Sequence, residues 1–577
     1  MLRMNKLVSL VVAIVLCLTL FPVASYAALQ PYHAPAETSG SITVKLHPTE
    51  NVATGSNQLV TFGVPFPRGS VTAANLSKIR VLKNGVEIPA YVEQQTPWRH
   101  LTNAGIDGQS VRVARIQIHY TFSVSYPNYE TITVEWGTTA RSQNVTSFEE
   151  PRNGWHQVTS GTFVAADNVF EPNVYAVLPP EHLSKGMLRA RMDPFVSGIS
   201  DTRDNPTVMA ATEHYPGYSE YDYSSKNFFY TIINEDDPGV SANNLNPYKS
   251  DYEPWLYDRS SAMYVLYMRS GSFKALREAV RATDFYKNHI RPDGSFDLNS
   301  FDPKYSYDES MAYTYWLTGD NNVLSKIPLI VSAYQNVATR WTPTLNMFTE
   351  RHVGFKLLAN VVAYEVLGDT AYKNKVTEIV GDFIWHQNGA GGQMPANRID
   401  GGLYHTGKQH TEGSRNAYLA SPWMSALLVD AMVRAYGVSE DPGTADFIKR
   451  MGNMVKAASR SDSAHQYDTY SGALMYPDYL MKADGTKDMR SNSDVQHAID
   501  VGSIAAWAYY FSLVQGTPDT TLKQLANDLY FTFDIGVNYW TRPTAPASGN
   551  TAFRVSPPRK YGWEYRTSGS FSWLVTQ

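Results

Sequence analysis

Apolar and polar residues alternate with a period of two along the first part of the chain. From about Ser41 to Trp136, every second position is apolar in the segments SITVKLHP, QLVTFGVPFP, KIRVLKNGVEIPAYVEQ, VRVARIQIHYTFSV and ETITVEWG. This period is typical of β-strands with one buried face. Asn84-Gly85 lies between two such runs and is a strong hairpin signal. The pattern predicts an antiparallel β domain within residues 28–150.

The period becomes helical from about Trp255 onward. Five apolar segments end in a glycine, and a second helical segment follows each: AMYVLYMRSG, SMAYTYWLTG, LANVVAYEVLG, LLVDAMVRAYG and WAYYFSLVQG. Successive turn glycines are 48, 49, 69 and 79 residues apart, at Gly271, Gly319, Gly368, Gly437 and Gly516. Each interval has room for two helices and a connection. Repeated hairpins that bury their faces against neighbours predict an α/α toroid over residues 246–577, with an open helical solenoid as the alternative.

The predicted fold class is therefore multidomain, with β structure first and α structure second. Residues 151–245 combine short β-like runs with the tyrosine-rich loop YPGYSEYDYSSKNFFY, and we predict a β or irregular middle region there. The sequence stops at Gln577 inside the apolar run SFSWLVTQ, which leaves open that a last helix or domain is missing.

The first residues have the order of a secretory signal. Arg3 and Lys6 precede an apolar run from Leu7 to Leu20, and small residues follow, ending at Ala27. The run is shorter than the roughly 20 residues that span a bilayer. We therefore expect residues 1–27 to be a signal peptide cleaved after about Ala27, a secreted protein, and no membrane span afterwards.

Composition narrows the function classes. Cys17 is the only cysteine, so the mature chain has no disulfide and no thiol nucleophile. The formal net charge is -5, so the composition does not indicate the basic surface that binds nucleic acid. Aromatic residues make up 13% of the chain, with 38 Tyr and 12 Trp. Such residues fill large cores, and they also form saccharide grooves because a ring face packs on the C–H face of a sugar.

In a helical array of this kind the entries to all first helices lie on one face. These entries read YEPWLYDRS, PKYSYDES, FTERHVGF, TEGSRNAYL and SDVQHAID, and they mix charges with Tyr, Trp or His. Acidic residues there complement the helix dipole, whereas the arginines oppose it. Arg259, Arg351 and Arg415 therefore indicate an anionic ligand at this face.

The loop GLYHTGKQHTEGSRN, at 402–416, precedes the fourth entry and overhangs the same face in this interpretation. Gly402 and Gly407-Lys408 imitate a P-loop, but Gln409 stands where a Ser or Thr is needed and no apolar strand comes before. We expect no nucleotide, also because an exported protein has no dependable ATP supply. A metal site is the competing interpretation of His405 and His410. No carboxylate lies at a recognised ligand spacing, so we expect no metal and no other cofactor.

The phrase TFGVPFPRG, Thr61–Gly69, together with the domain order of an exported chain, resembles the rhamnogalacturonan exolyase-like family. The resemblance implies an N-terminal RIFT barrel, a middle β-sandwich and a C-terminal α/α toroid, with a polysaccharide as substrate. It covers most of the mature chain. The residues of that family's active site are not matched to positions in this sequence.

The hypothesis that follows is a polysaccharide lyase acting on a uronate-containing glycan. A lyase neutralises the sugar carboxylate, removes the proton on the adjacent carbon and protonates the leaving oxygen. We assign Arg351 and Arg415 to the carboxylate, His410 or His352 as the base and Tyr307 as the acid. Further candidates for binding the acidic polysaccharide are Trp255, Tyr257, Arg259, Tyr404, Lys408, Glu412, Trp423 and His497.

Two other functions remain open at this point. A glycoside hydrolase would use a carboxylate pair roughly 5 Å or roughly 6.5 to 9.5 Å apart. Its candidates are Asp258, Asp308, Glu309, Glu350, Glu412 and Asp494. A non-catalytic polysaccharide-binding protein at the cell surface would need only the β domain and the aromatic face. We expect Trp255, Tyr307, His352, Arg415 and His497 to approach one common cleft.

Overall fold

The computed structural model describes residues 29–159, 163–195, 221, 255–298, 301–465, 467, 470–490, 496–541 and 560–577. By internal contacts the chain divides into residues 1–31 with Gln577, and residues 32–576. The fold below is that of the second unit. The expected signal peptide and most of the tyrosine-rich loop lie outside the described residues. So does most of the stretch between about residues 230 and 260 in which we expect the change from β to α structure.

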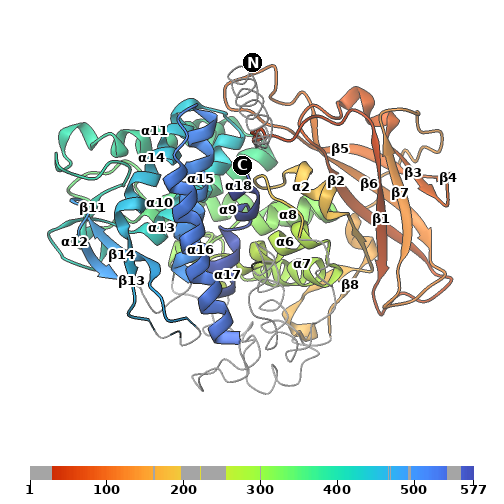
Figure 1. Ribbon diagram of the computed structural model, residues 1–577. Coiled ribbons are helices and arrows are strands. Elements are labelled where there is room, and N and C mark those ends of the chain that lie inside the picture. Colours follow the sequence, from red (N-terminus) through yellow and green to blue (C-terminus); the bar gives the residue numbers. More distant parts are fainter. Residues whose placement is uncertain are drawn as a thin grey trace, which may run out of the picture. The chain divides into compact units, whose positions relative to one another are not determined.

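Strands lie where the alternation predicts them. One antiparallel sheet has the order β10-β1-β7-β3-β4 (red to orange in Figure 1), formed by Val174–Val177, Gly40–Pro48, Glu130–Trp136, Arg80–Lys83 and Val86–Ile88. A second sheet has the order β2-β6-β5, formed by Asn57–Pro65, Val111–Thr121 and Tyr91–Pro97. β3 and β4 form the hairpin predicted at Asn84-Gly85. The layout of β structure first and α structure second is confirmed.

The first sheet extends beyond the boundary that we predicted at residue 150. β10 pairs antiparallel with β1, with Val177 opposite Lys45 and Val174 opposite Pro48. A small pair, β8 (Trp155–Gln157) and β9 (Phe170–Pro172), and the short helix α2 (Pro180–Gly186) flank this strand. Part of the middle region thus belongs to the N-terminal β structure.

Six helices of the second half form a closed ring. Each contacts the next in the order α6, α8, α10, α13, α15, α17, and α17 contacts α6. Their bounds are Arg259–Ser270, Glu309–Thr318, Glu350–Leu367, Pro422–Gly437, Gln496–Val514 and Lys560–Arg566. The helices that follow the first five are α7 (Phe273–Asn288), α9 (Lys326–Ala333), α11 (Thr370–Gln387), α14 (Pro442–Ala458) and α16 (Thr520–Thr541). A short α18 (Phe571–Val575) comes after the ring.

Most of the predicted turn glycines end helices as expected. Gly271, Gly319 and Gly368 cap α6, α8 and α10 with φ of 65°, 75° and 73°, a left-handed conformation that glycine adopts without a Cβ penalty. Gly516 also has a positive φ of 69°. Gly437 differs, because it is the last residue of α13 and Val438 is its C-cap.

The two longest intervals between glycines contain a sheet that the sequence did not predict. Its order is β11-β12-β14-β13, with β15 paired to β14. The strands span His405–Thr406, Tyr418–Ala420, Leu474–Lys482, Ser459–Asp462 and Lys487–Arg490. A one-turn helix, α12 (Gly407–His410), connects β11 toward β12. The loop that imitates a P-loop is therefore held by strand pairing on both sides.

The β half and the helical half share a close-packed boundary. A Cβ added to Gly63 of β2 would lie 1.7 Å from the carbonyl oxygen of Trp316 in α8, so the backbones approach too closely for a side chain. The Trp316 indole N–H donates to Thr96 Oγ1 at 3.0 Å. Tyr364 Oη of α10 donates to the carbonyl of His100 at 2.9 Å. Gly63 belongs to the segment TFGVPFPRG. A glycine is required at this position because a larger residue would clash with α8.

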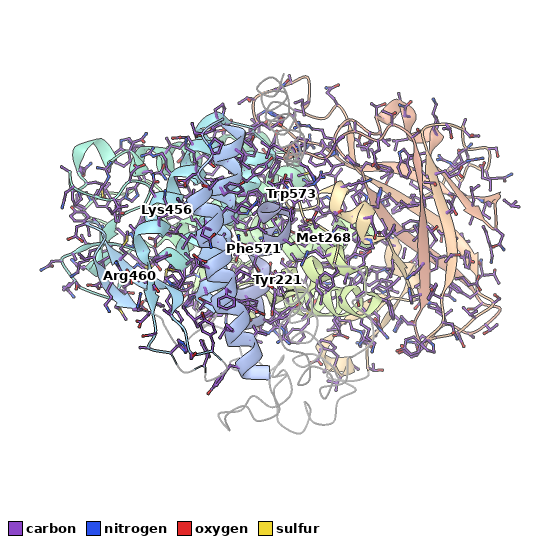
Figure 2. The ribbon with its side chains drawn as sticks, in the orientation of Figure 1. Tyr221, Met268, Lys456, Arg460, Phe571 and Trp573 are labelled. Carbon is purple, nitrogen blue, oxygen red and sulfur yellow. The ribbon has the colours of Figure 1, made fainter. Side chains whose placement is uncertain are left out.

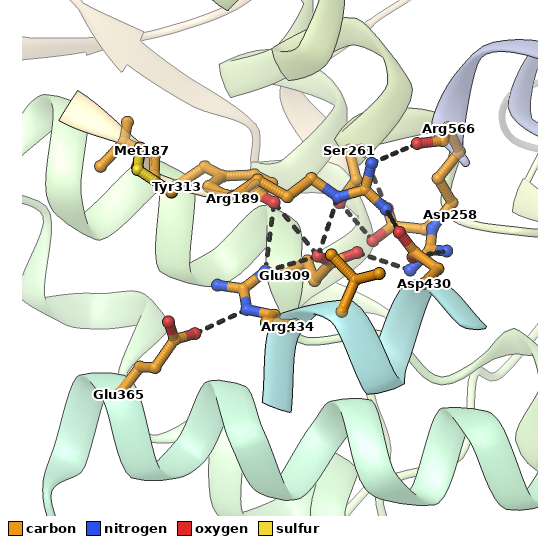
Figure 3. Close-up of polar contacts among 12 residues, drawn as sticks. Met187, Arg189, Asp258, Ser261, Glu309, Tyr313, Glu365, Asp430, Arg434 and Arg566 are labelled. Atoms are coloured by element: carbon orange, nitrogen blue, oxygen red, sulfur yellow. Dashed lines mark hydrogen bonds and ion pairs between the residues drawn. The ribbon is translucent and has the colours of Figure 1, made fainter. Parts of the chain in front are cut away.

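A buried ionic network lies inside the ring (Figure 3). Glu309, with 0% exposure, ion-pairs Arg434 and Arg566, each at 2.5 Å, and Arg189 at 3.4 Å. The arginines have further partners, because Arg434 Nε lies 2.6 Å from Glu365 and Arg566 Nη1 lies 2.8 Å from Asp430. Glu365 also pairs Arg112 of β6 at 2.5 Å. The network therefore joins four ring helices to a strand of the β half.

Apolar and aromatic side chains fill much of the remaining core. Tyr221 is the one residue that the structure describes between 196 and 254, and it is buried. Its Oη lies 2.7 Å from Ser568 Oγ, and it belongs to the same core as Met268, Phe571 and Trp573 (Figure 2). A search of the described residues for a membrane-crossing helix finds none with the needed length and apolar character.

Candidate functional site

A cavity of about 280 Å³ lies where three helix entries meet. The first entry is the stretch around η5 (Pro303–Tyr305) before α8, the second is the start of α10, and the third is the loop before α13 with the first turn of that helix. The lining residues are Asp302, Pro303, Lys304, Met347, Thr349, Arg351, His352, His410, Thr411, Glu412 and Met424. Arg351, His352, His410 and Glu412 of the predicted set are brought together here.

Arg351 presents a guanidinium to this cavity. Its Nη1 donates to Tyr257 Oη at 2.7 Å, and its Cζ lies 5.9 Å from the ring centres of Tyr257 and Trp423. Its Nε is buried and has no hydrogen-bond partner. Among the described residues, no carboxylate lies within ion-pairing distance of this guanidinium, including the neighbouring Glu350 and Glu412. An arginine in this state keeps a two-pronged donor available for an anion.

A chain of hydrogen bonds fixes the proton positions on two buried imidazoles. His405 Nδ1 lies 2.9 Å from the carbonyl oxygen of Leu403, which only accepts, so Nδ1 carries the proton and Nε2 does not. His410 Nδ1 lies 2.8 Å from His405 Nε2 and must donate to it. The second nitrogen of His410, Nε2, is then unprotonated. Within the described part of the chain it has no hydrogen-bond partner, and it lies 3.9 Å from Glu412 Oε2.

Both imidazoles are neutral near pH 7. Burial lowers the pKa of His405 to about 4. Burial, with smaller contributions from His405, Arg351 and His352, lowers the pKa of His410 to about 2. His410 Nε2 is therefore unprotonated, and it is buried, because the His410 side chain has 0% exposure.

His352 has both ring nitrogens engaged. Thr349 Oγ1 caps α10 by accepting the His352 backbone N–H at 3.4 Å, so its own proton is free to go to His352 Nδ1 at 2.7 Å. His352 Nε2 then carries a proton and lies 3.3 Å from Asp302 Oδ1. Asp302 also pairs Lys304 Nζ at 2.8 Å. Burial alone raises the pKa of Asp302, but its bonds to His352 and Lys304 outweigh burial and lower it.

Glu350, the first residue of α10, lies behind the cavity and is not exposed. Its Oε1 accepts the Ser421 backbone N–H at 2.8 Å. Its Oε2 has no hydrogen-bond partner among the described residues and lies 4.0 Å from His405 Nε2. Burial raises the pKa of Glu350 to about 8.

Other predicted residues lie outside the cavity lining. Tyr307 Oη accepts the Tyr257 backbone N–H at 2.7 Å and donates to the Lys304 carbonyl, so its proton holds a loop in place and is not free for an acid role. Trp255 stacks on Phe285 and Tyr286. Arg259 is buried at the start of α6.

The five residues expected in one cleft are thus separated. Only His352 of that set lines the cavity. Arg415 and Lys408 are exposed on the loop beside it, whereas His497 packs against Trp423 and Trp563. Helix entries share a face, but each side chain also depends on local packing that the entry sequence does not reveal.

The predicted aromatic platform is buried. Trp255, Tyr257, Tyr404 and Trp423 are each exposed by 4% or less, so no ring among them offers an open face to a sugar. These rings fill the space between the helix entries. Sequence reasoning missed Asp302 and Thr349, which orient His352. The signals available were an Asp before Pro303 and a Thr directly before the helix that begins at Glu350.

Comparisons with known proteins do not identify a family for this chain. No protein-family model matches this chain, and no curated protein matches it. The chain is similar to a solved structure described as Polysaccharide Lyase BACCELL_00875, with 11% sequence identity and a TM-score of 0.29. The match covers 92% of this chain and 65% of that one, so this chain spans less than two thirds of its length. At this level the similarity carries no argument, and the exolyase-like family stays a prediction.

Proposed function

We propose that this chain is a polysaccharide lyase that cleaves a uronate-containing glycan by β-elimination in the cavity beside Arg351. The observation that carries the proposal is a pairing of two groups. Arg351 offers a guanidinium without a carboxylate partner among the described residues, and His410 offers an unprotonated Nε2 at the same cavity. Elimination needs both a cation for the sugar carboxylate and a base for the adjacent proton.

Arg351 acts on the carboxylate of the uronate. Removal of the proton on the adjacent carbon pushes negative charge onto the carboxylate oxygens, and a fixed guanidinium stabilises this charge. A bidentate contact also orients the sugar. The tyrosine hydroxyl that Arg351 contacts, Tyr257 Oη, holds the guanidinium in place without neutralising it.

His410 acts as the base in this proposal. Its Nε2 takes the proton from the carbon beside the carboxylate, and the electrons of that C–H bond form the new double bond as the bond to the leaving oxygen breaks. Glu412 Oε2, 3.9 Å from Nε2, stabilises the imidazolium that forms. The leaving oxygen is protonated by this imidazolium or by Lys304, because both line the cavity and Tyr307 is occupied.

The hydrolase hypothesis finds weaker support. Of its candidate carboxylates Glu412 alone lines the cavity, while Asp494 lies outside the described residues. Asp302 also lines the cavity, yet its pKa is lowered, whereas a general acid needs a raised one. The export of this enzyme remains an inference from residues 1–27 alone.

The test is incubation of the purified protein with a panel of uronate-containing polymers. A rise in ultraviolet absorbance from an unsaturated product supports the lyase. New reducing ends without that absorbance would indicate a hydrolase, and binding with neither signal would indicate a binding protein. Either of these two results would overturn the proposal.

A further inference from the structure

Three buried side chains beside the cavity direct ligand atoms toward one point. They are Glu350 at the start of α10, His405 in β11 and His410 at the end of α12. The Glu350 carboxylate oxygen and one nitrogen of each imidazole all lie within 4.8 Å of one another. Two backbone segments far apart in the sequence therefore supply a compact set of one oxygen and two nitrogens.

Two of the three groups, His405 and Glu350, are oriented by a hydrogen bond on the far side. His405 Nδ1 donates to the Leu403 carbonyl, which leaves Nε2 facing the group. Glu350 Oε1 accepts the Ser421 N–H, which leaves Oε2 facing His405. His410 Nε2 points the other way, 3.9 Å from Glu412, and its Nδ1 faces inward. Outer hydrogen bonds such as those of His405 and Glu350 typically orient the ligands of a metal.

We propose that Glu350, His405 and His410 bind a divalent first-row transition metal ion, with Zn²⁺ as the reference ion. Two imidazoles and one carboxylate form a ligand set that zinc uses, whereas calcium and magnesium prefer oxygen ligands alone. Without an ion, the hydrogen bond between the imidazoles pairs His405 Nε2 with His410 Nδ1. It leaves Glu350 Oε2 buried without a partner, which costs stability, and an ion removes that cost.

The sequence led us to expect no metal here, because His405 and His410 are close together and no carboxylate stands at a known spacing from them. Glu350 is on a different helix, so no local spacing includes it. Only the fold places its Oε2 beside His405.

A bound ion would change the part that His410 plays in the cavity. If Nδ1 coordinates the ion, Nε2 must carry the proton of the neutral ring and becomes a donor. His410 Nε2 could then not accept a proton from the substrate, so a bound ion would inhibit the proposed elimination. This consequence rests on the proposed function, whereas the binding of the ion does not.

The binding test uses the purified chain after dialysis against a chelator, titrated with Zn²⁺ by calorimetry and checked by elemental analysis. We expect one equivalent to bind and the melting temperature to rise. E350Q and H405Q should each weaken the binding by at least 100-fold. H119Q removes an exposed histidine that pairs Glu149 at 2.7 Å, and it should bind as the wild type does.

Wild-type affinity in E350Q, or no binding by the wild-type chain, would overturn the proposal. If H119Q alone lost zinc binding, the ion would bind at the exposed His119, and this result would also overturn the proposal. If H405Q does not fold, E350Q still decides, because the amide of that variant keeps the shape of the carboxylate and an acceptor for the Ser421 N–H. Co²⁺ provides a second readout, since its visible absorption reports nitrogen and oxygen ligands directly in the wild type and in E350Q.

Discussion

Two of the places where the helical half buries charge differ in how that charge is paired. Around Glu309 three arginines converge on one carboxylate, and each of them also pairs a second acidic residue (Figure 3). At the cavity Arg351 contacts a phenol, and Glu350 Oε2 has no hydrogen-bond partner. Glu309 and Glu350 are each the first residue of a ring helix, so helix position alone does not explain the difference.

The difference separates a structural role from a binding role. Breaking a buried ion pair leaves an uncompensated charge, so a network such as that of Glu309 resists change and joins its helices. A buried group that lacks its partner costs stability in the free protein, and such groups gather at functional sites. This contrast is the reason that we propose a binding role for the cavity and a structural role for the Glu309 network.

Replacing Glu309 should have the largest effect. E309Q leaves Arg434 and Arg566 without their shared carboxylate, and we expect the free energy of unfolding to fall by about 3 to 5 kcal/mol. Chemical denaturation measures this loss. E50Q is the matched control, because Glu50 is 51% exposed in its pair with Arg277 and its loss should cost no more than about 1 kcal/mol. Equal effects of the two changes would contradict the comparison.

Acid should release the same network. Burial raises the pKa of Glu309, but Arg566, Arg189 and Arg434 outweigh it and lower the pKa from 4.5 to about 2. A lowered pKa in the folded state gives stability that is complete above about pH 4.5 and is lost as the pH falls toward 2, on the order of 3 kcal/mol. Melting temperatures of wild type and E309Q should converge over this range. A constant difference between them would exclude Glu309 as the group that titrates.

Replacing His410 should reduce turnover without removing the fold. H410Q keeps a polar side chain and removes the base, so we expect the turnover number to fall by about 100-fold, which corresponds to about 2.7 kcal/mol. The rate of unsaturated product formation measures it. H119Q, on the surface of the β half, should keep wild-type turnover, and full activity of H410Q would assign the base to another residue.

Replacing Arg351 with lysine should have the smallest of these effects. R351K keeps the positive charge but loses the bidentate contact, and we expect turnover to fall by about tenfold, or about 1.4 kcal/mol. R340K is the matched control, because Arg340 is 51% exposed and lies over Trp385. Unchanged turnover of R351K on a proven uronate substrate would place the carboxylate contact elsewhere.

The sequence predicted the regular elements better than the site. Alternation located β1 to β7, and recurring glycines located the ends of α6, α8 and α10, because both signals are local. The sheet of β11 to β15 was missed, since its strands are short and lie within long connections between helices. Val177 belongs to the first sheet because it pairs with Lys45. These residues are far apart in the sequence, so no local pattern predicts the pairing.

For the site, the choice of helix entries was informative and the individual roles were not. Arg351 was singled out because it opposes the dipole of its own helix, and it lines the cavity. Tyr307 was assigned as an acid from its neighbours in sequence, but its hydroxyl binds two backbone groups. The grouping of Glu350 with His405 depends on tertiary structure, so residue spacing could not reveal it.

Binding of an acidic glycan and of its neutral counterpart tests the central claim most directly. The ligands are a uronate oligosaccharide from an active polymer and the same oligosaccharide with its carboxylates reduced to alcohols, titrated into H410Q to slow turnover. The account predicts at least tenfold tighter binding of the acidic form, about 1.4 kcal/mol, and loss of this preference when R351Q is added. Equal affinity for the two ligands, or a preference that survives R351Q, would contradict it.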